Sequence, residues 1–368
     1  MNCEFHLPGR ILFGCGERRG LPGLLAPGNV LIVTGRHSRR RVEAELLPAL
    51  EGRTVRLVSD ASPEPPIPDV ERIIAAGREI DAGCVIGWGG GSAIDAAKTA
   101  AALMRQEGSV ADYFYGRRKI GGKGCFFAAL PTTAGTGAEI TPNAVLTDPE
   151  TGIKQSIRHD TMFADVAIVD PELTWDCPPG VTAASGFDAL TQGIESYLSK
   201  KANVASEALA LKAAADVFTM LLPAVRESAP PARTMVAEGS MLAAMAFAQS
   251  GLGSVHGIGH PLGSLLHVPH GVCCAILLPA LLRRNLPACR EKMEVLAGML
   301  VQDSAEAMIA AIEELRRAVG LPENFSRYGL KEEHFDFIVK NCRSGSMKSN
   351  PRDFLDDEVR MILKELMG

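Results

Sequence analysis

The sequence predicts an α/β domain built on a parallel sheet, followed by an all-helical domain. Up to about residue 175, short apolar runs alternate with helical patterns and end at Gly or Pro. Beyond about residue 178 these runs disappear, and long stretches rich in Ala, Leu, Met and Glu follow. A chain of 368 residues is also long enough for two domains. We place the boundary at the rigid turn of Pro178, Pro179 and Gly180, which gives domains of residues 1–178 and 179–368.

Five apolar runs are predicted as strands of the first domain. Runs of about four to eight apolar residues between helices are typical of parallel strands that are buried on both faces. A helical pattern from Asp69 to Ile80 separates the second run from the third. This alternation predicts a Rossmann-like, doubly wound sheet of the kind that binds nucleotides. The runs are residues 29–35, 54–60, 84–91, 125–133 and 166–170.

The second domain is predicted as a helical bundle. Its apolar residues recur at the spacing that places them on one face of a helix. This pattern extends over long segments without strand signals, so we expect no sheet in this half of the chain. The predicted helices are residues 182–198, 206–227, 233–248, 304–319 and 356–367.

Composition and charge exclude several classes of protein. Hydrophobic residues make up 46% and charged residues 22%, as in ordinary globular proteins. The net charge of −5 argues against nucleic acid as a partner, because phosphate binding needs a basic surface. The N-terminus has no apolar signal region, and no apolar stretch approaches the ~20 uncharged residues that span a membrane. Nine cysteines without CxxC spacing indicate thiols in a reducing compartment, so we expect a cytoplasmic protein.

A glycine-rich turn is the first candidate binding feature. Residues 88–101 read WGGGSAIDAAKTAA, after a predicted strand and into a predicted helix. Gly89, Gly90 and Gly91 let the backbone approach a bulky anion, and the helix start favours phosphate. Ser92 can cap the helix or bond a phosphate oxygen. The string is neither GxGxxG nor a Walker motif, so a tight structural turn stays open as an alternative.

A second loop, PTTAGTGAE at residues 131–139, also follows a predicted strand. It is rich in hydroxyl groups and glycine. Ligands of open α/β sheets bind at the carboxyl ends of strands, where both loops are expected. Two such loops on one edge indicate a ligand cleft more strongly than one loop does.

Acidic and histidine residues at helical spacing are the candidate metal ligands. Asp188 and Gln192 lie four residues apart, as do His256 and His260, which places each pair on one helical face. Four of the chain's eight histidines fall within residues 256–270. Carboxylate and imidazole together suit Fe²⁺ or Zn²⁺. From spacing alone, buried core residues and metal ligands are equally open interpretations.

Together these segments resemble the iron-containing (group III) alcohol dehydrogenase family. The motifs are GGGSAIDAAK, LPTTAGTGAE, AIVDPEL, GFDALTQGIESYLS and HGIGHPLG followed by PHGV, and the similarity covers almost the whole chain. The resemblance implies a dehydroquinate synthase-like fold, with the active site in the cleft between the domains. It also implies an oxidoreductase that uses NADP or NAD and a divalent metal, Fe²⁺ or Zn²⁺. Its substrate would be a small alcohol or aldehyde, and the enzyme would be a homodimer.

The resemblance also implies roles for individual residues. His260 is the candidate catalytic proton carrier, with a residue that only orients a metal ligand as the alternative. The other residues fall into three groups: the pyrophosphate turn, the surroundings of the nicotinamide and its ribose, and the metal site. In that order they are Gly89, Gly90, Gly91, Ser92, Asp95 and Lys98; Thr132, Thr133, Thr136 and Lys154; and Asp188, Gln192, His256 and His270.

One position departs from the family pattern. The family has a histidine four residues after the aspartate, and this chain has Gln192. An amide oxygen is a weaker ligand than imidazole for Fe²⁺ or Zn²⁺. The site then binds metal through Asp188, His256 and His270, or adds Gln192 as a weak fourth ligand, or works without metal as in maleylacetate reductases. We favour a bound metal, because three ligands make the open site that catalysis needs.

The end of the first predicted strand bears on the choice between NADP and NAD. An acidic residue after an early strand typically binds the adenosine ribose of NAD, and Gly35 stands at that place here. Without a carboxylate to repel it, a 2′-phosphate can bind Arg36, Ser38 and the neighbouring Arg39 and Arg40. We therefore expect NADP in preference to NAD, with a solvated basic helix start as the alternative.

Three other functions stay open from the sequence. A metal-free keto-acid reductase, similar to maleylacetate reductase, would use NAD(P)H and resist chelators. A lyase on the same scaffold, as in dehydroquinate synthase, would use NAD transiently and give no net change in nicotinamide absorbance. A catalytically inactive relative would bind the nucleotide without turning over alcohol. The intact loop at residues 131–139 and the histidine cluster weigh against this last alternative.

Overall fold

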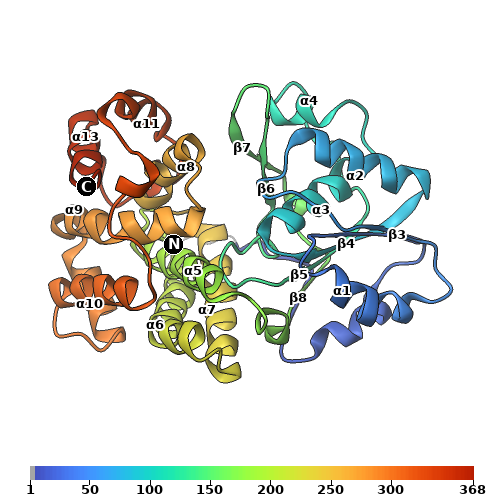
Figure 1. Cartoon of the computed structure of the whole chain (residues 1–368), viewed down its shortest axis with the longest axis horizontal. Helices are drawn as coiled ribbons and strands as arrows, with labels where there is room; N and C mark the ends of the chain where they lie inside the picture. Colours follow the sequence, from blue (N-terminus) through green and yellow to red (C-terminus); the bar gives the residue numbers. More distant parts are fainter. Residues whose placement is uncertain (1–4) are drawn as a thin grey trace. The chain divides into compact units, whose positions relative to one another are not determined.

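The computed structural model describes residues 5–368, which form two compact units. Residues 7–133 and 137–174 make up the first, called the sheet unit. Residues 5–6, 134–136 and 175–368 make up the second, called the helical unit (Figure 1). The chain therefore leaves the sheet unit at residues 134–136 and returns to it before its final passage into the helical unit.

The sheet unit contains a sheet of six strands in the order β1-β8-β5-β4-β2-β3, and all neighbouring pairs are parallel. The central strands β2 (Asn29–Thr34) and β4 (Ala82–Gly89) are buried along almost their whole length, as in sheets that are covered on both faces. The predicted fold class, a parallel sheet followed by helices, is confirmed. The other strands are β1 (Arg10–Phe13), β3 (Val55–Val58), β5 (Phe126–Pro131) and β8 (Val166–Val169).

Alternate residues of β2 point to opposite faces of the sheet. Val30 and Ile32 share a buried cluster with Leu21 of the 3₁₀ helix η1 (Glu17–Leu24). On the other face, Leu31 lies against Gly77 of α2 (Ile67–Glu79), where an added Cβ would come within 3.1 Å of Leu31 Cδ2. Helices α2 and α3 (Gly91–Leu103) lie on one side of the sheet and α1 (Arg39–Arg41) on the other (Figure 1).

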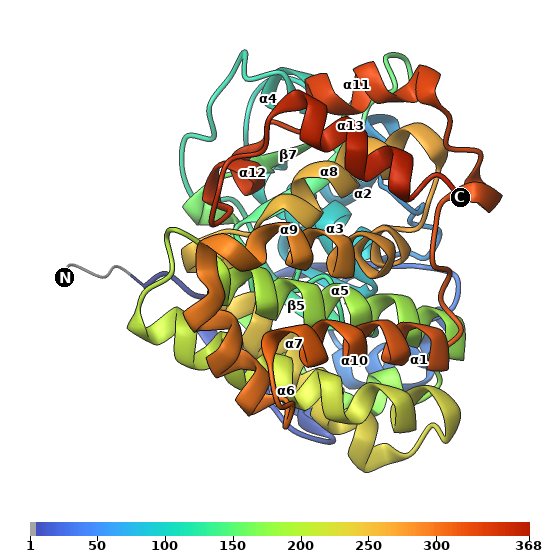
Figure 2. The same ribbon diagram turned by 90° about the vertical axis from the view of Figure 1, so that its left-hand side faces the viewer.

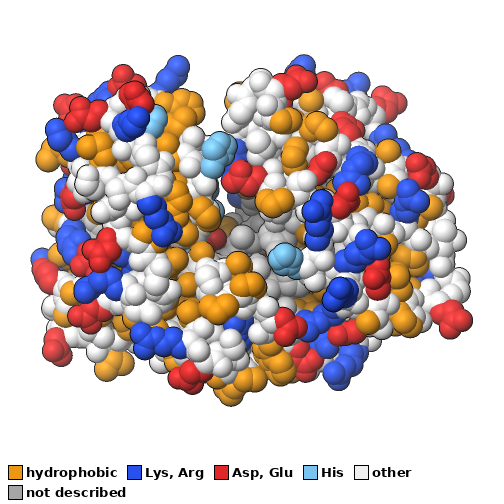
Figure 3. Space-filling view, in the orientation of Figure 1, with side chains coloured by type: hydrophobic (Ala, Val, Ile, Leu, Met, Phe, Trp, Pro, Cys, Tyr) orange, Lys and Arg blue, Asp and Glu red, His pale blue; other side chains and the backbone are white. Residues whose placement is uncertain are grey.

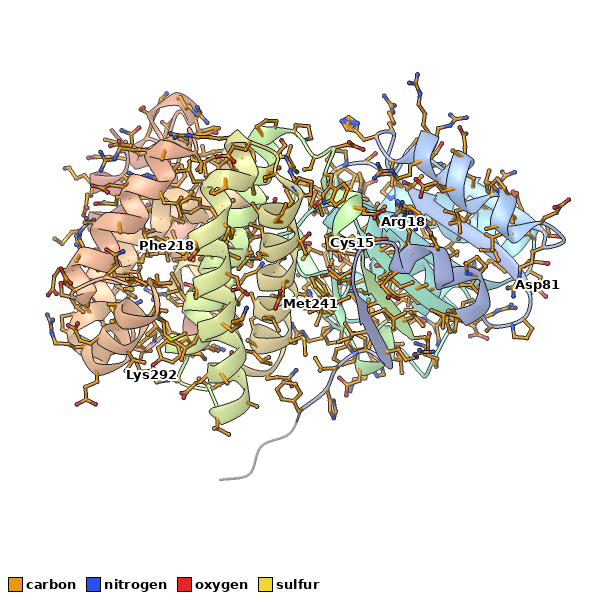
Figure 4. The ribbon with its side chains drawn as sticks, turned by 90° about the horizontal axis from the view of Figure 1, so that it is seen from below. Cys15, Arg18, Asp81, Phe218, Met241 and Lys292 are labelled. Atoms are coloured by element: carbon orange, nitrogen blue, oxygen red, sulfur yellow. The ribbon has the colours of Figure 1, made fainter. Side chains whose placement is uncertain are left out.

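Arg18 fixes η1 to the carboxyl end of β8 (Figure 4). Its Nη1 and its backbone N–H both donate to Asp170 Oδ2, at 2.8 and 3.2 Å, directly after β8. Burial opposes the charge of Arg18, but hydrogen bonds to Glu45, Glu172 and Asp170 outweigh it and raise the pKa of the guanidinium. The carboxyl end of β8 is thereby held in place.

The order of the strands creates a candidate ligand crevice. Strands β2 and β4 are neighbours although β3 lies between them in the sequence. The connection after β2 runs to β3 on one side, and the connection after β4 runs to β5 on the other side. Open α/β sheets bind ligands at such a switch point, beyond the carboxyl ends of the strands. In register, Thr34 pairs with Trp88 and Gly89 with Pro131, so β2, β4 and β5 end together.

Two parts of the sheet unit are not predicted from the sequence. Strand β1 has only four residues and pairs with β8 alone, at the edge of the sheet. Strands β6 (Asn143–Thr147) and β7 (Lys154–Arg158) form a separate antiparallel hairpin. The sequence of β7, KQSIR, is mostly polar, so it lacks the apolar run by which the other strands are recognised.

The helical unit is a bundle around α5 (Pro179–Leu198), which packs against α6 (Val204–Arg226), α7 (Pro230–Ser250) and α9 (His270–Met299) (Figure 2). Every residue of α5 from Gly186 to Leu198 is buried, so its polar side chains must find partners inside the bundle. The remaining helices are α8 (Ser254–Leu266), α10 (Ala305–Ala318), α11 (Phe335–Asn341), α12 (Gly345–Ser349) and α13 (Asp356–Glu365).

Helices α6 and α9 are long and apolar enough to cross a membrane by length and composition alone. Neither is free of charged residues, which is why neither is predicted as a span above. Residues of both belong to the apolar core that they share with α5, and the apolar window of α9 is 72% buried within the protein. Burial in the bundle therefore explains the hydrophobicity of α9, whereas the apolar window of α6 is 44% buried.

Charged side chains of both signs are mixed over the face of the molecule in Figure 3. This mixing follows from the near balance of 38 basic and 43 acidic residues.

Candidate active site

The glycine-rich turn joins β4 to α3 in the sheet unit. Gly90 occupies the N-cap position of α3 with an extended backbone and no side chain to cap the helix. An added Cβ on Gly89 would lie 2.8 Å from Ala93 Cβ, whereas one on Gly90 would meet only Thr133, at 3.7 Å. Packing therefore requires Gly89, while Gly90 leaves space in front of the uncapped helix start. That space, with the backbone N–H groups of the first turn, suits a phosphate group.

Several predicted cofactor residues of the sheet unit gather around this turn. The Thr132 N–H donates to Gly89 O at 3.0 Å, and Thr133 lies beside Gly90. The Gly35 nitrogen is 3.8 Å from the position of a Cβ on Gly89, across the switch point. Thr136 belongs to the helical unit, through the segment of residues 134–136.

Glu64 links the turn to the hairpin. Its backbone N–H donates to Ser92 Oγ at 3.1 Å, and its Oε1 accepts a hydrogen bond from Lys154 Nζ at 2.6 Å. The predicted residues Ser92 and Lys154 are thus both tied to one exposed loop residue. Glu64 adopts a positive φ of 49°, and no sequence motif identifies it beforehand.

Asp95 and Lys98 of α3 lie beneath the turn, where Lys98 is buried and Asp95 is half-buried. Lys98 Nζ donates to three carbonyl oxygens, those of Ala138 and Thr141 at 2.6 Å and that of Asn143 at 2.7 Å. The Asp95 carboxylate accepts a hydrogen bond from the Val145 N–H at 3.0 Å. Both side chains therefore position the segment that leads into β6, and direct contact of Asp95 with the cofactor stays a prediction.

Burial shifts the pKa values of these groups. It raises the pKa of Asp95 to about 6 and lowers the pKa of Lys98 to about 8. The attraction between the two opposite charges partly offsets both pKa shifts. It also raises the pKa of the neighbouring Glu139 to about 7. The segment around the turn is thus held by buried ionisable groups, and its stability depends on pH.

Residues 35–41 form a short basic turn after β2. The Ser38 N–H donates to Gly35 O at 3.2 Å, which closes the turn. Arg39 pairs with Glu43 at 2.7 Å. Arg36 and Arg40 are exposed and have no ion-pair partner within residues 5–368. These two arginines are therefore available to an anion.

The helical unit brings together the predicted metal ligands from three helices. Asp188 lies on α5, His256 on α8 and His270 at the start of α9. Asp188 Oδ1 is 3.2 Å from His256 Nε2 and 3.6 Å from His270 Nε2. Asp188 and His256 are buried, whereas His270 is 31% exposed. One carboxylate and two imidazoles thus converge, with one side open to a ligand.

Cys274 completes this cluster and is not among the sequence-predicted site residues. Its Sγ and the donor atoms of Asp188, His256 and His270 all lie within 4.8 Å of one another. Cys274 follows His270 by four residues on α9, the same spacing that marks Asp188 and Gln192. That spacing was the available signal, but the cysteine stands within an apolar run and looks like a core residue.

Glu195 is a second functional residue that the sequence did not reveal. Its buried carboxylate accepts a hydrogen bond from His256 Nδ1 at 2.7 Å and from the N–H groups of Gly253 and Val255 at 2.9 and 2.6 Å. An ionised carboxylate only accepts, so Nδ1 of His256 has the proton and Nε2 faces the cluster. Carboxylates commonly orient a metal-binding histidine in this way. Glu195 follows Asp188 by seven residues, on the same face of α5.

The cluster requires a positive charge. With Nδ1 of His256 protonated, a neutral imidazole would turn the Nε2 lone pair towards the Asp188 carboxylate, so two acceptors would meet at 3.2 Å. Burial opposes charge on His256, yet Cys274, Asp188 and Glu195 outweigh it and raise its pKa well above the ordinary value. Burial likewise opposes the Asp188 charge, and the facing His270 and His256 lower its pKa. Either a proton or a cation satisfies this arrangement, and the donor set fits a divalent metal.

Gln192 and His260 border the cluster in different ways. Gln192 Nε2 donates to Asp188 Oδ1 at 3.0 Å, and its Oε1 is buried without a hydrogen-bond partner in the described chain. His260 is exposed, and its ring stacks on that of His270 with centroids 5.2 Å apart. An exposed imidazole beside a buried cluster is suited to exchange protons with solvent.

A glycine-rich turn at the switch point of a parallel sheet and an Asp/His/His cluster in a helical bundle are typical of one class: dehydrogenases with an α/β domain and a helical, metal-binding domain. Residues 8–171 match the family described as "Iron-containing alcohol dehydrogenase". Residues 182–367 match "Fe-containing alcohol dehydrogenase family, C-terminal". The chain belongs to the iron-containing alcohol dehydrogenase family, and the resemblance inferred from its motifs is confirmed.

Known members of the family are similar over most of the chain. The long-chain-alcohol dehydrogenase 1 of Geobacillus thermodenitrificans is 38% identical over 85% of this chain and 82% of its own length. The 1,3-propanediol dehydrogenase of Klebsiella pneumoniae is 35% identical over 85% and 84%. The crystal structure of sulfoacetaldehyde reductase from Bifidobacterium kashiwanohense in complex with NAD⁺ has a TM-score of 0.94. It is 32% identical and covers 100% of this chain and 99% of that one.

Proposed function

We propose that this protein transfers hydride between NAD(P) and a small alcohol or aldehyde, with a divalent cation bound by Asp188, His256 and His270. The convergence of these three donors is the observation on which the proposal mainly rests. Three protein ligands with an open side are typical of catalytic metal sites. The alcohol dehydrogenases among its relatives support the same reaction.

The proposal divides the work between residues 1–178 and 179–368, as predicted from the sequence. In the first part, Gly89 to Ser92 bind the pyrophosphate, because the α3 start is uncapped and Gly90 leaves room. Thr132, Thr133, Thr136 and Lys154 bind near the nicotinamide and its ribose. Asp95 and Lys98 hold the adjoining segment in place.

In the second part, Asp188, His256 and His270 would hold the cation, and the half-exposed side of the cluster at His270 admits the substrate oxygen. A bound divalent cation supplies Lewis-acid charge, which polarises a carbonyl or lowers the pKa of an alcohol. Glu195 keeps His256 Nε2 directed at the cluster. His260 takes the hydroxyl proton and passes it to solvent, while the hydride leaves carbon for the nicotinamide ring. Aldehyde reduction runs through the same residues in reverse.

We further propose that the enzyme accepts NADP in preference to NAD. Gly35 places no carboxylate at the end of β2, and Arg36 and Arg40 are exposed without ion-pair partners in the described chain. Ser38 adds a hydroxyl to the same turn. Comparison of KM for the two cofactors tests this proposal, and a clear preference for NAD contradicts it. The variant Arg36→Ala should raise KM for NADP and leave KM for NAD unchanged.

A cytoplasmic location and a homodimer belong to the same proposal. The eight cysteines within residues 5–368 are all free thiols, in keeping with a reducing compartment. Two-fold dimers are the commonest assemblies of soluble enzymes. Fractionation of the source cells and light scattering on the purified protein test these two points.

The decisive functional experiment is a panel of small alcohols and aldehydes assayed with both cofactors. Turnover should follow nicotinamide absorbance and should be lost when the cation is removed with a chelator. Turnover that survives complete removal of the cation would instead support the metal-free reductase. The variant His256→Ala should lose bound metal and turnover together, and full turnover by this variant would refute the proposed site.

A further inference from the structure

We infer that Cys274 Sγ is the fourth donor of the cation site, in the position that Gln192 leaves vacant. This inference rests on the proposed function, since it assumes that a cation binds at Asp188, His256 and His270. It names a sulfur ligand that the family pattern does not include, and it therefore also concerns the choice of metal.

The distances support a single ion between the four donors. Zn–S bonds of about 2.3 Å and Zn–N or Zn–O bonds of about 2.0 Å, at tetrahedral angles, separate the donors by about 3.3–3.6 Å. Cys274 Sγ is 3.8 Å from Asp188 Oδ1, 3.8 Å from His270 Nε2 and 4.0 Å from His256 Nε2. Of the two nitrogen–oxygen separations, 3.6 Å is at the upper end of this range and 3.2 Å is just below it. All four donor atoms lie within 4.8 Å of one another, so side-chain movements of about an ångström bring them to one ion.

Gln192 does not fill this role in the structure. The atom it presents to Asp188 is the amide nitrogen Nε2, which donates a hydrogen bond and has no lone pair for a metal. Its Oε1 is buried without a partner, and the residue is only 3% exposed. A buried unsatisfied oxygen beside a donor cluster indicates that a hydrogen-bonding ligand, such as water or the substrate hydroxyl, belongs there. Gln192 thus faces a ligand, and Cys274 supplies the missing metal donor.

A sulfur donor changes which metal the site prefers. Thiolate is a soft ligand and selects Zn²⁺ over harder ions, whereas an Asp and three His suit Fe²⁺ equally well. A bound divalent cation deprotonates a coordinating thiol, so the Sγ–metal bond forms as the thiol proton leaves for solvent. The site is therefore a zinc site of the Asp/His/His/Cys type, and the substrate oxygen adds as a fifth ligand from the side on which His270 is 31% exposed.

Cobalt substitution provides a test that does not depend on turnover. The full-length protein is stripped with a chelator and titrated with Co²⁺ alone under reducing conditions. Sulfur coordination should produce a thiolate-to-cobalt charge-transfer band in the near ultraviolet, beside the visible bands of tetrahedral Co²⁺. Zn²⁺ should displace the cobalt and abolish both sets of bands.

Two single variants test whether the charge-transfer band comes from Cys274. Cys274→Ser should lose the charge-transfer band and keep visible cobalt bands, because Asp188, His256 and His270 remain. Cys273→Ser is the matched control, since Cys273 is equally buried, adjacent in sequence and directed towards Val268 O. It should keep the full spectrum of the unmodified protein. The spectrum of the unmodified protein is informative even if a variant fails to fold.

The outcomes separate this inference from the proposed function. Co²⁺ bound without a charge-transfer band, or a band retained in Cys274→Ser, overturns the inference and leaves the dehydrogenase proposal intact if alcohol is turned over. If the protein binds no cation and still turns over alcohol, both the sulfur ligand and the metal-assisted reaction are refuted. A charge-transfer band in a protein that turns over no alcohol supports the sulfur ligand and contradicts the function.

Discussion

The substitution Glu195→Gln tests how the protein orients its metal-binding histidine. The Glu195 carboxylate accepts three buried hydrogen bonds, from His256 Nδ1 and from the N–H groups of Gly253 and Val255. Glutamine has the same shape, but its amide nitrogen is a donor and cannot accept any of the three. At least one hydrogen bond is therefore lost whichever way the amide is turned.

The two amide orientations have different consequences, and both are unfavourable. With the nitrogen towards Val255, a buried N–H group loses its acceptor, which costs about 1–3 kcal/mol of folding stability. With the nitrogen towards His256, Nδ1 becomes the acceptor and the proton moves to Nε2, the atom that should bind metal. Loss of such an orienting partner typically weakens metal affinity by about 10–100-fold.

The assay is a competitive chelator titration with Zn²⁺, combined with urea unfolding of the metal-free protein. The Kd for Zn²⁺ should rise by about 10–100-fold, in keeping with other orienting partners of metal-binding histidines. Glu227→Gln provides the control, because Glu227 is an exposed carboxylate of the same unit without an ion-pair partner in the described chain. Unchanged Zn²⁺ affinity and stability in Glu195→Gln would refute the assignment of Glu195 as the residue that positions His256.

Three further predictions concern both units. Gly90→Ala should raise the cofactor KM and leave thermal stability unchanged, because the new Cβ meets only Thr133 at 3.7 Å and fills the proposed phosphate space; a stable variant with unchanged KM contradicts that role. Glu139→Gln should stabilise the protein at pH 8 by about 1–3 kcal/mol and have little effect at pH 5, measured by urea unfolding at both pH values. The sign follows from burial, which raises the pKa of Glu139 to about 7 in the folded protein. Ionisation of Glu139 therefore destabilises the folded state as the pH rises from about 4.5 to 7. An equal change in the free energy of unfolding at pH 5 and pH 8 contradicts this prediction. Gln192→His adds an imidazole one turn after Asp188 and should raise the ratio of bound Fe²⁺ to Zn²⁺ in elemental analysis, and an unchanged ratio would show that residue 192 does not face the metal.

The sheet and the main helices could be predicted because their signals are local. An apolar run such as residues 29–34 is buried on both faces, so nearly every position is apolar and the pattern is visible without knowledge of neighbours. Strand β7 has no such pattern, because it lies in a separate hairpin where only Ile157 is buried. Its existence depends on pairing with β6, which the sequence of β7 does not reveal.

Helix α9 was not predicted because its composition argues against a helix. It contains Pro279 and Pro287, and its backbone departs from helical geometry at Cys289. Proline removes a hydrogen bond and normally ends or kinks a helix. Burial of most of α9 in the core of the bundle outweighs this local preference. Tertiary packing thus determined the element that holds His270.

Some residues of the candidate site could likewise be predicted from the sequence, and others could not. Asp188, His256 and His270 could be named because they stand in motifs that resemble those of the family, although their spacing alone left core residues as an alternative. Cys274 and Glu195 could not, since a cysteine in an apolar run and a glutamate in a helix are usually ordinary residues. Their roles arise from the packing of α5, α8 and α9, which brings Cys274 Sγ to 3.8 Å from Asp188 Oδ1 and the Glu195 carboxylate to His256 Nδ1.

The most direct test of the account is metal analysis of the purified protein joined to an alcohol-dependent assay of nicotinamide reduction. The account predicts a stoichiometric divalent cation, loss of turnover when a chelator removes it, and recovery of turnover when zinc is restored. Full alcohol turnover by protein that contains no metal would contradict the account.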